Sequence, residues 1–465
     1  MRARRALAVT LLVSAAVVLT GGASAFAHTV ERGIGLPDSY WSDNAARQAA
    51  VEELYTDLRA GWVRFDMSWR TAEPAEGVYD EAYIASIAAT CTQAHDLGIH
   101  VLLSVWKVPE WASDKSLWSP PAWPDQPGYR SYYAPAVSKL PRLTEFMQHL
   151  SQACGDAVWG YECWNEPNLW MFLYPQIKGS DKQFGARRYV AMLKAFHAGV
   201  AQGAPAAKVV AGALGPYGVN DRYRTDPYRF AVFMKNLGAA PYLDYFSDHP
   251  YQVGSSSTYP PERLPRFPDR SVTLSNLGPL LKLYSTKPFI LTEYGYTTTY
   301  SLQMGGLPVS QPRQADYLRR AYAYAGRYGQ VKALLWYLLR DESASGTWNT
   351  GLRTFGGARK RAWYAFSRAT RLTLQTSAQR IKRGTRVTFS GALTWSPRNG
   401  SPQGLGGRQI RIERRRSGGV WVLVKAVSTT ADGGFSLRLR PSGTAVYRAR
   451  WEGVTASPGR TVSVY

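Results

Sequence analysis

Short apolar runs alternate with longer segments of helical periodicity over most of this chain. Between residues 28 and 371 the apolar runs are rich in β-branched and aromatic residues, as expected for buried strands. Eight such runs occur, at 33–36, 62–67, 100–106, 158–164, 208–214, 245–249, 289–293 and 331–338. Segments of helical period lie between them, among them 43–60, 81–97, 138–154, 181–202, 311–328 and 360–369. This alternation predicts an α/β fold, and eight repeats predict a (β/α)8 TIM barrel.

The pattern changes after residue 369 to a period of two, with Gly, Pro and Ser between the runs. Seven short runs follow, at 371–376, 385–390, 409–413, 421–427, 435–439, 445–451 and 460–464. Seven short strands in fewer than 100 residues are typical of a small β-sandwich of immunoglobulin-like kind, here without a cysteine pair. We therefore expect a (β/α)8 barrel domain over residues 28–371 and an accessory all-β domain over residues 372–465.

The first 27 residues have the order of a signal peptide. Basic residues are followed by an apolar run from Ala6 to Leu19 and by a small-residue stretch that ends at Ala27. A retained membrane anchor is the alternative, but the run is short and a Gly pair follows it. No later segment is apolar enough to span a bilayer, so we expect a secreted protein, with association to the cell wall as a further option.

Cysteine and charge change this picture in two ways. Three cysteines exclude a disulfide-built scaffold, and the coarse map of the elements favours a bridge between Cys91 and Cys154 with Cys163 buried and free.

The 94 residues from 372 carry sixteen Lys and Arg against three acids. This excess favours contact with an anionic cell-envelope polymer, although an Arg-rich lineage explains it equally well. The exported location argues against nucleic acid as the partner.

Two glutamates stand where predicted strands end. Glu166 follows the fourth run and Glu293 closes the seventh, so both side chains reach the C-terminal mouth of the barrel, where TIM-barrel active sites lie. Cleavage of a glycosidic bond with retention needs two carboxyl groups roughly 5 Å apart. One is a general acid/base and the other a nucleophile that a nearby cation keeps ionised. Arg64, at the end of the second run, is the candidate cation.

The motifs around these residues resemble the retaining glycoside hydrolases of clan A, especially families 5 and 39. Matching text includes Trp164-Asn165-Glu166-Pro167, Thr292-Glu293-Tyr294-Gly295, Arg64, and His249 with Tyr251. The resemblance spans nearly the whole barrel and none of the tail. It implies Glu166 as acid/base, Glu293 as nucleophile, and substrate contacts by Asn165, His249, Tyr251 and Trp336. Trp69, Trp106 and Tyr296 are further candidates for substrate binding.

Two long loops carry aromatic side chains suited to stacking on sugar rings. Loop 107–135 has Trp111, Trp118, Trp123, Tyr129, Tyr132 and Tyr133, and loop 168–179 has Trp170, Phe172 and Tyr174. They favour an extended cleft and endo action on a polysaccharide or glycoconjugate. The alternative is that these rings pack the loops together.

Motifs for metal or cofactor binding are absent from the sequence. The six histidines form no metal motif, and no phosphate or dinucleotide loop is present, so we expect neither a metal nor a cofactor. Structural roles are the alternative for single residues: Glu166 as a solvated acid, Glu293 or Arg64 as an ion-pair partner, and His249 as a core residue. For the whole protein, the alternative is a non-catalytic carbohydrate-binding or cell-surface adhesion protein on a hydrolase scaffold.

Overall fold

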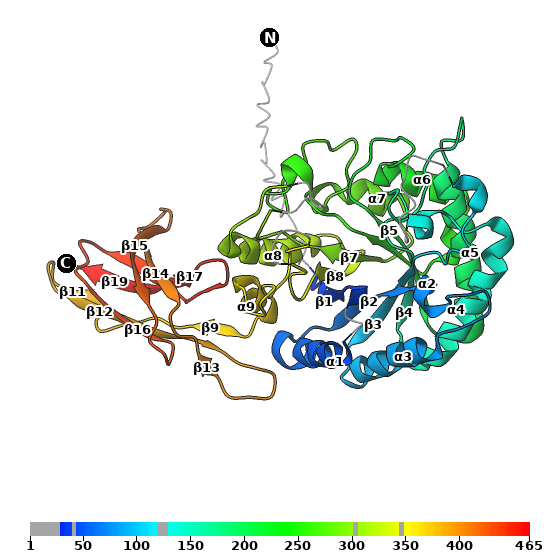
Figure 1. Ribbon diagram of the computed structural model, residues 1–465. Coiled ribbons are helices and arrows are strands. Elements are labelled where there is room, and N and C mark those ends of the chain that lie inside the picture. The colour runs from blue at the N-terminus through cyan, green and yellow to red at the C-terminus, as the bar shows by residue number, and fades with distance from the viewer. Residues whose placement is uncertain (1–27, 40–42, 119–128, 301–305, 344–347) are drawn as a thin grey trace, which may run out of the picture.

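Eight parallel strands close into a barrel in the computed structural model (Figure 1), which describes residues 28–39, 43–118, 129–300, 306–343 and 348–465. Each strand pairs with its neighbours in chain order, and β1 closes the ring on β8. The strands are β1 (Glu31–Leu36), β2 (Trp62–Ser68), β3 (His100–Trp106), β4 (Gly160–Cys163), β5 (Lys208–Leu214), β6 (Tyr245–Asp248), β7 (Phe289–Tyr294) and β8 (Val331–Tyr337). The barrel prediction is confirmed, with all eight runs in strands. The expected signal peptide lies outside the described residues.

Helices surround this barrel and cover its outer face (Figure 1). They are α1 (Asn44–Glu53), α2 (Trp69–Ala72), α3 (Glu81–Asp96), α4 (Leu140–Cys154), α5 (Phe184–Gly203), α6 (Pro227–Asn236), α7 (Gly278–Leu283), α8 (Gln311–Ala325) and α9 (Arg361–Ser367). The helical segment expected over 43–60 continues past α1 as a π-helical turn, Leu54–Leu58, and ends at Arg59 in the left-handed conformation. Among the described residues, none of the helices has the length and apolarity to cross a membrane.

Alternation along the strands separates the barrel interior from the helix-covered face. Gly35 of β1 is level with Arg64 of β2 and with Tyr337 of β8, so these three residues face the same side. Trp62, Ile290, Ala333 and Leu335 form a small apolar cluster in the N-terminal half of the interior. Above it the interior becomes polar, and this is where the candidate site begins.

The region after α9 is all β, as expected, and consists of two sheets. One contains β9 (Thr370–Leu372), β10 (Gln375–Thr376), β12 (Val387–Trp395), β13 (Gln403–Gly404) and β16 (Gly434–Leu439). The other contains β11 (Arg380–Ile381), β14 (Gln409–Arg415), β15 (Val422–Ser428), β17 (Ala445–Trp451), β18 (Thr455–Ala456) and β19 (Arg460–Val464). Phe389 and Tyr447 meet across the two sheets, with ring centroids 4.7 Å apart.

Aromatic stacking joins this region to the side of the barrel near α9. The rings of Trp363 and Trp395 lie 5.1 Å apart, as do those of Tyr364 and Trp451. The guanidinium of Arg359 lies 3.9 Å from the ring centre of Trp363 and 4.8 Å from that of Trp395. The two parts therefore share buried aromatic surface.

The disulfide expected between Cys91 and Cys154 is not formed; all three cysteines are free and buried. Cys91 lies on α3 and Cys154 ends α4, and the two thiols share a hydrogen bond. That bond, together with burial, raises the pKa of Cys91 well above its ordinary value. The same hydrogen bond lowers the pKa of Cys154, so the shared proton is held on Cys91. Cys163 is free and buried, as expected.

Candidate active site

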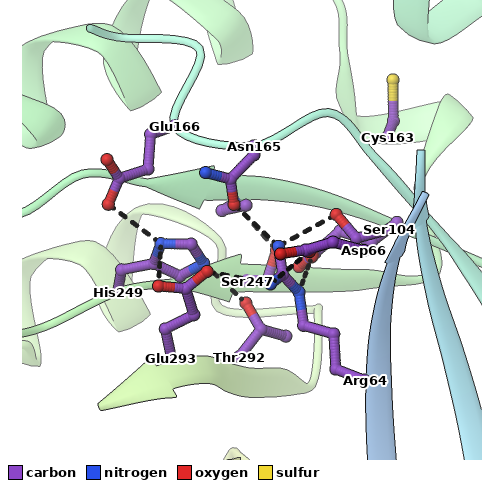
Figure 2. Close-up of polar contacts among 12 residues, drawn as sticks. Arg64, Asp66, Ser104, Cys163, Asn165, Glu166, Ser247, His249, Thr292 and Glu293 are labelled. Atoms are coloured by element: carbon purple, nitrogen blue, oxygen red, sulfur yellow. Dashed lines mark hydrogen bonds and ion pairs between the residues drawn. The ribbon is translucent and has the colours of Figure 1, made fainter. Parts of the chain in front are cut away.

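Arg64 is the centre of a buried polar cluster in the C-terminal half of the barrel. Its side chain is fully buried, and its guanidinium contacts three carboxyl groups from three strands (Figure 2). Its partners are Glu162 (2.6 Å), Asp66 (2.7 Å), Glu293 (2.8 Å), the Asn165 side-chain oxygen (2.7 Å) and the Ser104 hydroxyl (2.9 Å). One cation cannot neutralise three carboxylates, so some of these acids are most stable with a proton.

Glu166 and Glu293 approach each other across the mouth from opposite strands. Glu166 follows β4, and its backbone N–H donates to the carbonyl of Ala213 at 2.9 Å. Its φ of 37° and that of Trp164, 72°, are unusual for residues with a side chain and mark a backbone held by its surroundings. Glu293 lies on β7. A carboxyl oxygen of Glu166 and one of Glu293 lie within 4.8 Å of each other.

His249 and Tyr251 hold these two carboxyl groups in place. His249 Nδ1 lies 3.0 Å from Glu166 Oε1, and its Nε2 lies 3.1 Å from the hydroxyl of Thr292. Burial, helped by the positive charge of Arg64, lowers the pKa of His249 well below its usual value, so the ring is neutral. Tyr251 donates its hydroxyl proton to Glu293 Oε2 at 3.1 Å. The structure thus brings Arg64, His249 and Tyr251 to the two glutamates, together with Asn165.

The two carboxyl groups differ in their electrostatic surroundings. Burial raises the pKa of Glu166 to about 8, with Arg64 opposing this rise. Burial, with the nearby charges of Asp66 and Glu166, raises the pKa of Glu293 well above its usual value, and the Arg64 ion pair and the Tyr251 hydrogen bond oppose this rise by favouring the charged form. Asp66 shares Arg64 with Glu293, and burial raises its pKa to about 7. At neutral pH Glu166 is therefore mostly protonated.

Glu166, His249 and Glu293 are also the described residues that could hold a metal ion, since one ligand atom of each lies within 4.8 Å of the others. Their atoms, however, are already engaged with one another and with Arg64. A divalent ion there would be close to the guanidinium of Arg64, and two cations repel at this distance. The donor set therefore suits proton transfer and nucleophilic attack better than metal binding.

Three residues expected to bind substrate are placed elsewhere. Trp336 is fully buried, is level with Ile34 and Val63 on the helix-covered face, and donates its indole N–H to the carbonyl of Thr350. Trp69 is buried under the loops, where it stacks on Phe146 and donates to Glu73. Tyr296 is buried and donates to the carbonyl of Tyr259. Their expected substrate contact is wrong in this structure, because no face of these rings is open.

Trp106 and most loop aromatics pack against protein groups. Trp106, at the end of β3, is half-buried edge-on against Phe172, with ring centroids 5.2 Å apart. Other ring pairs within the loops are Trp69–Trp111, Tyr132–Trp170 and Tyr133–Tyr174, and the indole N–H of Trp118 donates to Ser113. Trp123 lies outside the described residues. The alternative that the rings hold the loops together therefore applies to most of them.

The site also contains residues that the sequence analysis missed. Asp66, Ser104 and Glu162 contact Arg64, and each lies on a barrel strand. Asp66 could have been found, because it is two residues from Arg64 on the same strand and so shares its face. Tyr337 is the ring of β8 that faces the interior, and Trp348 lies 5.6 Å from both Tyr251 and Tyr337.

A cavity of about 500 Å³ opens beside Glu166. Its walls come from the loops after β4, β5 and β6, and Trp348, from the loop after β8, contributes at another side. The volume is within the range of ligand-binding sites.

Comparison with known proteins adds evidence on the fold. No family model matches the sequence, and no curated protein matches it. Among solved structures, a family 39 glycoside hydrolase from Bacteroides cellulosilyticus WH2 is similar, with a TM-score of 0.52 and 15% identity over 89% of this chain and 81% of that one. Endo-glycoceramidase II from Rhodococcus sp. gives 0.46 and 15% over 90% and 98%, and the β-glycosidase BGL167 gives 0.48 and 13% over 73% and 95%. At 15% identity the similarity to the family 39 structure shows the fold alone, a TIM barrel.

Proposed function

We propose that this protein is a retaining O-glycoside hydrolase, acting on β-linked substrates by double displacement, with Glu166 as acid/base and Glu293 as nucleophile. The observation that carries the proposal is the separation of the two carboxyl groups, whose oxygens lie within 4.8 Å. Retaining enzymes place their carboxyl groups about 5 Å apart, whereas inverting enzymes leave roughly 6.5–9.5 Å for a water molecule. The motifs that resemble clan A support the same assignment.

In the first step Glu293 attacks the anomeric carbon and Glu166 protonates the departing oxygen. The Arg64 ion pair and the Tyr251 hydroxyl orient the carboxylate of Glu293 and favour its charge. Glu166 starts with its proton because burial raises its pKa to about 8. His249, which is neutral, holds the Glu166 carboxyl at 3.0 Å without competing for charge.

In the second step Glu166 acts as base toward a water molecule. Once Glu293 is esterified its negative charge is gone, and a nearby carboxyl group no longer feels that charge, so its pKa falls. Arg64 then favours the charged form of Glu166 more strongly, as its effect on the pKa of Glu166 is already downward. Water loses a proton to Glu166, its oxygen attacks the anomeric carbon, and Glu293 leaves as a carboxylate.

Asn165 is suited to bind the sugar beside the reacting carbon. Its side-chain oxygen accepts from Arg64 at 2.7 Å, which fixes the amide so that its N–H₂ group faces away from the guanidinium. An amide donor at this place can bind a sugar hydroxyl. The contact fits the resemblance, in which the Asn before the acid binds the 2-hydroxyl.

Substrate screening with two matched variants tests this function. A panel of fluorogenic β-glycosides and polysaccharides is offered to the wild type, to Glu166→Gln and to Glu293→Gln. We expect hydrolysis by the wild type and a loss of at least about a thousandfold in Glu293→Gln. With an active substrate, NMR reads the anomer that forms first. Retained activity in Glu293→Gln, or an inverted product, would contradict the mechanism.

Export, endo action and the role of the tail complete the proposal. The residue pattern of 1–27 supports secretion with His28 as the first mature residue, which N-terminal sequencing of the exported protein checks. The cavity beside Glu166 leaves space for a large leaving group, which supports endo action on a glycoconjugate, with cleavage between its glycan and its aglycone. In the tail, the carboxylate of Glu413 is shared by Arg411, Arg448 and Arg450, so this cluster keeps a net positive charge. That charge supports binding of an anionic envelope polymer. Salt-sensitive retention on immobilised polyuronate checks that.

A further inference from the structure

The cavity beside Glu166 lies on one side of the proposed reaction centre. Glu166 lines it, and among the described residues that form its wall Glu293 and Arg64 do not occur. The proton donated by Glu166 goes to the oxygen of the leaving group, while Glu293 bonds to the sugar that stays behind. If the proposed function holds, the space beyond Glu166 therefore receives the leaving group.

The wall of this space is largely apolar. Its side chains include Leu169, Met171, Phe172, Pro216, Val253 and Pro265. Most of these are aliphatic and lack the flat face on which a pyranose ring stacks. Aromatic rings line other parts of the wall: Phe172, which packs against Trp106, and Tyr217, Phe267 and Trp348.

Two of the polar side chains in the wall, Ser256 and Thr273, are hydrogen-bonded within their own loops. The hydroxyl of Ser256 accepts from the backbone N–H of Arg266 at 2.8 Å, and the hydroxyl of Thr273 is hydrogen-bonded to Ser275 and Asn276. A sugar lying along the aliphatic side chains of the wall would lose water from its hydroxyl groups without finding a hydrogen-bond partner there. Burying a hydroxyl without a partner is unfavourable, so this wall selects against a second sugar.

Apolar surface continues from the cavity to the outside. Phe267 lines the cavity and is 43% exposed, and Leu264, three residues away in the same loop, is 56% exposed. The exposed side chain of Phe267 extends the apolar surface of the wall toward solvent, where an apolar group can lie. The wall and the rim thus match a leaving group longer than the cavity itself.

We propose that the leaving group is an extended apolar aglycone, such as the alkyl chain of a lipid-like glycoside, and that the loops after β4, β5 and β6 bind it. The glycosidic oxygen then lies at Glu166, the sugar over Glu293, and the chain along Leu169, Val253 and Phe267. The proposal deepens the proposed function and rests on it.

The test is a series of n-alkyl β-glycosides of one sugar, from methyl to decyl, each below its micelle concentration. Along the longer members the leaving alcohols have nearly the same acidity, so a change in kcat/KM reports binding of the chain. Each buried methylene is expected to raise kcat/KM up to about fourfold until the cavity is full. A flat series, or a disaccharide preferred over the alkyl glycosides, overturns the proposal and leaves the glycosidase function standing.

Two valine variants locate the effect. Val253 lines the cavity, whereas Val219 is 39% exposed in the loop after β5 and is not part of the wall. Val253→Asp is expected to remove most of the gain per methylene, because the chain would meet a carboxylate. Val219→Asp is expected to keep the gain. Equal slopes in both variants place the chain elsewhere and overturn the assignment.

Calorimetric binding of methyl and octyl β-glucoside separates the two proposals. If the octyl compound binds more tightly and no glycoside of the panel is hydrolysed, the cavity assignment stands and the glycosidase function is wrong. If neither compound binds detectably and the alkyl series is flat or uncleaved, the apolar leaving-group site is overturned.

Discussion

Replacing Glu166 by Gln should stabilise the protein in alkaline solution, because the fold holds this carboxyl group where its charged form is unfavourable. Burial raises the pKa of Glu166 from 4.5 to about 8. A pKa raised by folding stabilises the native state fully below the unfolded pKa, and this contribution is lost as pH rises toward the folded pKa. Ionisation of Glu166 therefore lowers the free energy of unfolding of the wild type at pH 9 but not at pH 4.

The size of the penalty follows from the shift. At about 1.4 kcal/mol per pKa unit, a rise from 4.5 to about 8 corresponds to roughly 5 kcal/mol once the pH exceeds both values. The side chain is only 11% exposed, so solvent screening reduces this figure little. Gln has nearly the same shape and cannot ionise, so the Glu166→Gln protein lacks this pH dependence.

Urea unfolding of both proteins at pH 5 and pH 9 measures the effect without any knowledge of the substrate. The free energy of unfolding of Glu166→Gln minus that of the wild type should grow by several kcal/mol between these pH values. Groups such as Asp66 ionise in both proteins and largely cancel in the difference. A difference that stays within about 0.5 kcal/mol, or shrinks as pH rises, would refute the burial of an unfavourable charge at Glu166.

Three further changes probe the same cluster. Asp66→Asn should move the alkaline limb of the kcat/KM profile to lower pH, because the charge of Asp66 helps to raise the pKa of Glu166; an unmoved limb would contradict this. Tyr251→Phe should lower kcat/KM by about 10- to 100-fold, as expected for a hydrogen bond to the charged Glu293, and steady-state kinetics measure it. Gly215→Ala would place its methyl carbon 2.5 Å from the Leu169 side chain and 3.1 Å from the carboxyl carbon of Glu166, so both side chains must shift. This change should lower kcat about a hundredfold, with unchanged circular dichroism as the check on folding.

The sequence was sufficient for the barrel, and for placing Glu166 and Glu293 together at its mouth, because both depend on local pattern. Eight apolar runs at regular spacing specify eight strands, and a charged residue directly after such a run must lie at a strand end. Glu166 and Glu293 satisfy this rule, and the long side chain of Arg64, from β2, reaches Glu293 of β7 inside the closed barrel.

The wrong predictions concern segments whose hydrophobic pattern does not show which face of the element each residue lies on. The run 331–338 is apolar at nearly every position, so it does not show whether Trp336 or Tyr337 faces the interior; the register with Gly35 decides in favour of Tyr337. Trp69 and Tyr296 are covered by loops that are distant in sequence, and no period within their own segments reports such coverage. Cys91 and Cys154 were correctly placed as neighbours, but adjacency alone does not specify a bond.

The contact of Arg359 with Trp363 and Trp395 bears on any truncation of the chain at residue 371. Residue 371 marks the place where the sequence pattern changes, yet Trp363 precedes it and is covered by Trp395, which follows it. A truncated barrel would present that indole to water, with Tyr364 uncovered beside it by the loss of Trp451. Such a fragment is expected to aggregate through these exposed rings. Fusion of the tail to another barrel would require a matching pair of rings on that barrel.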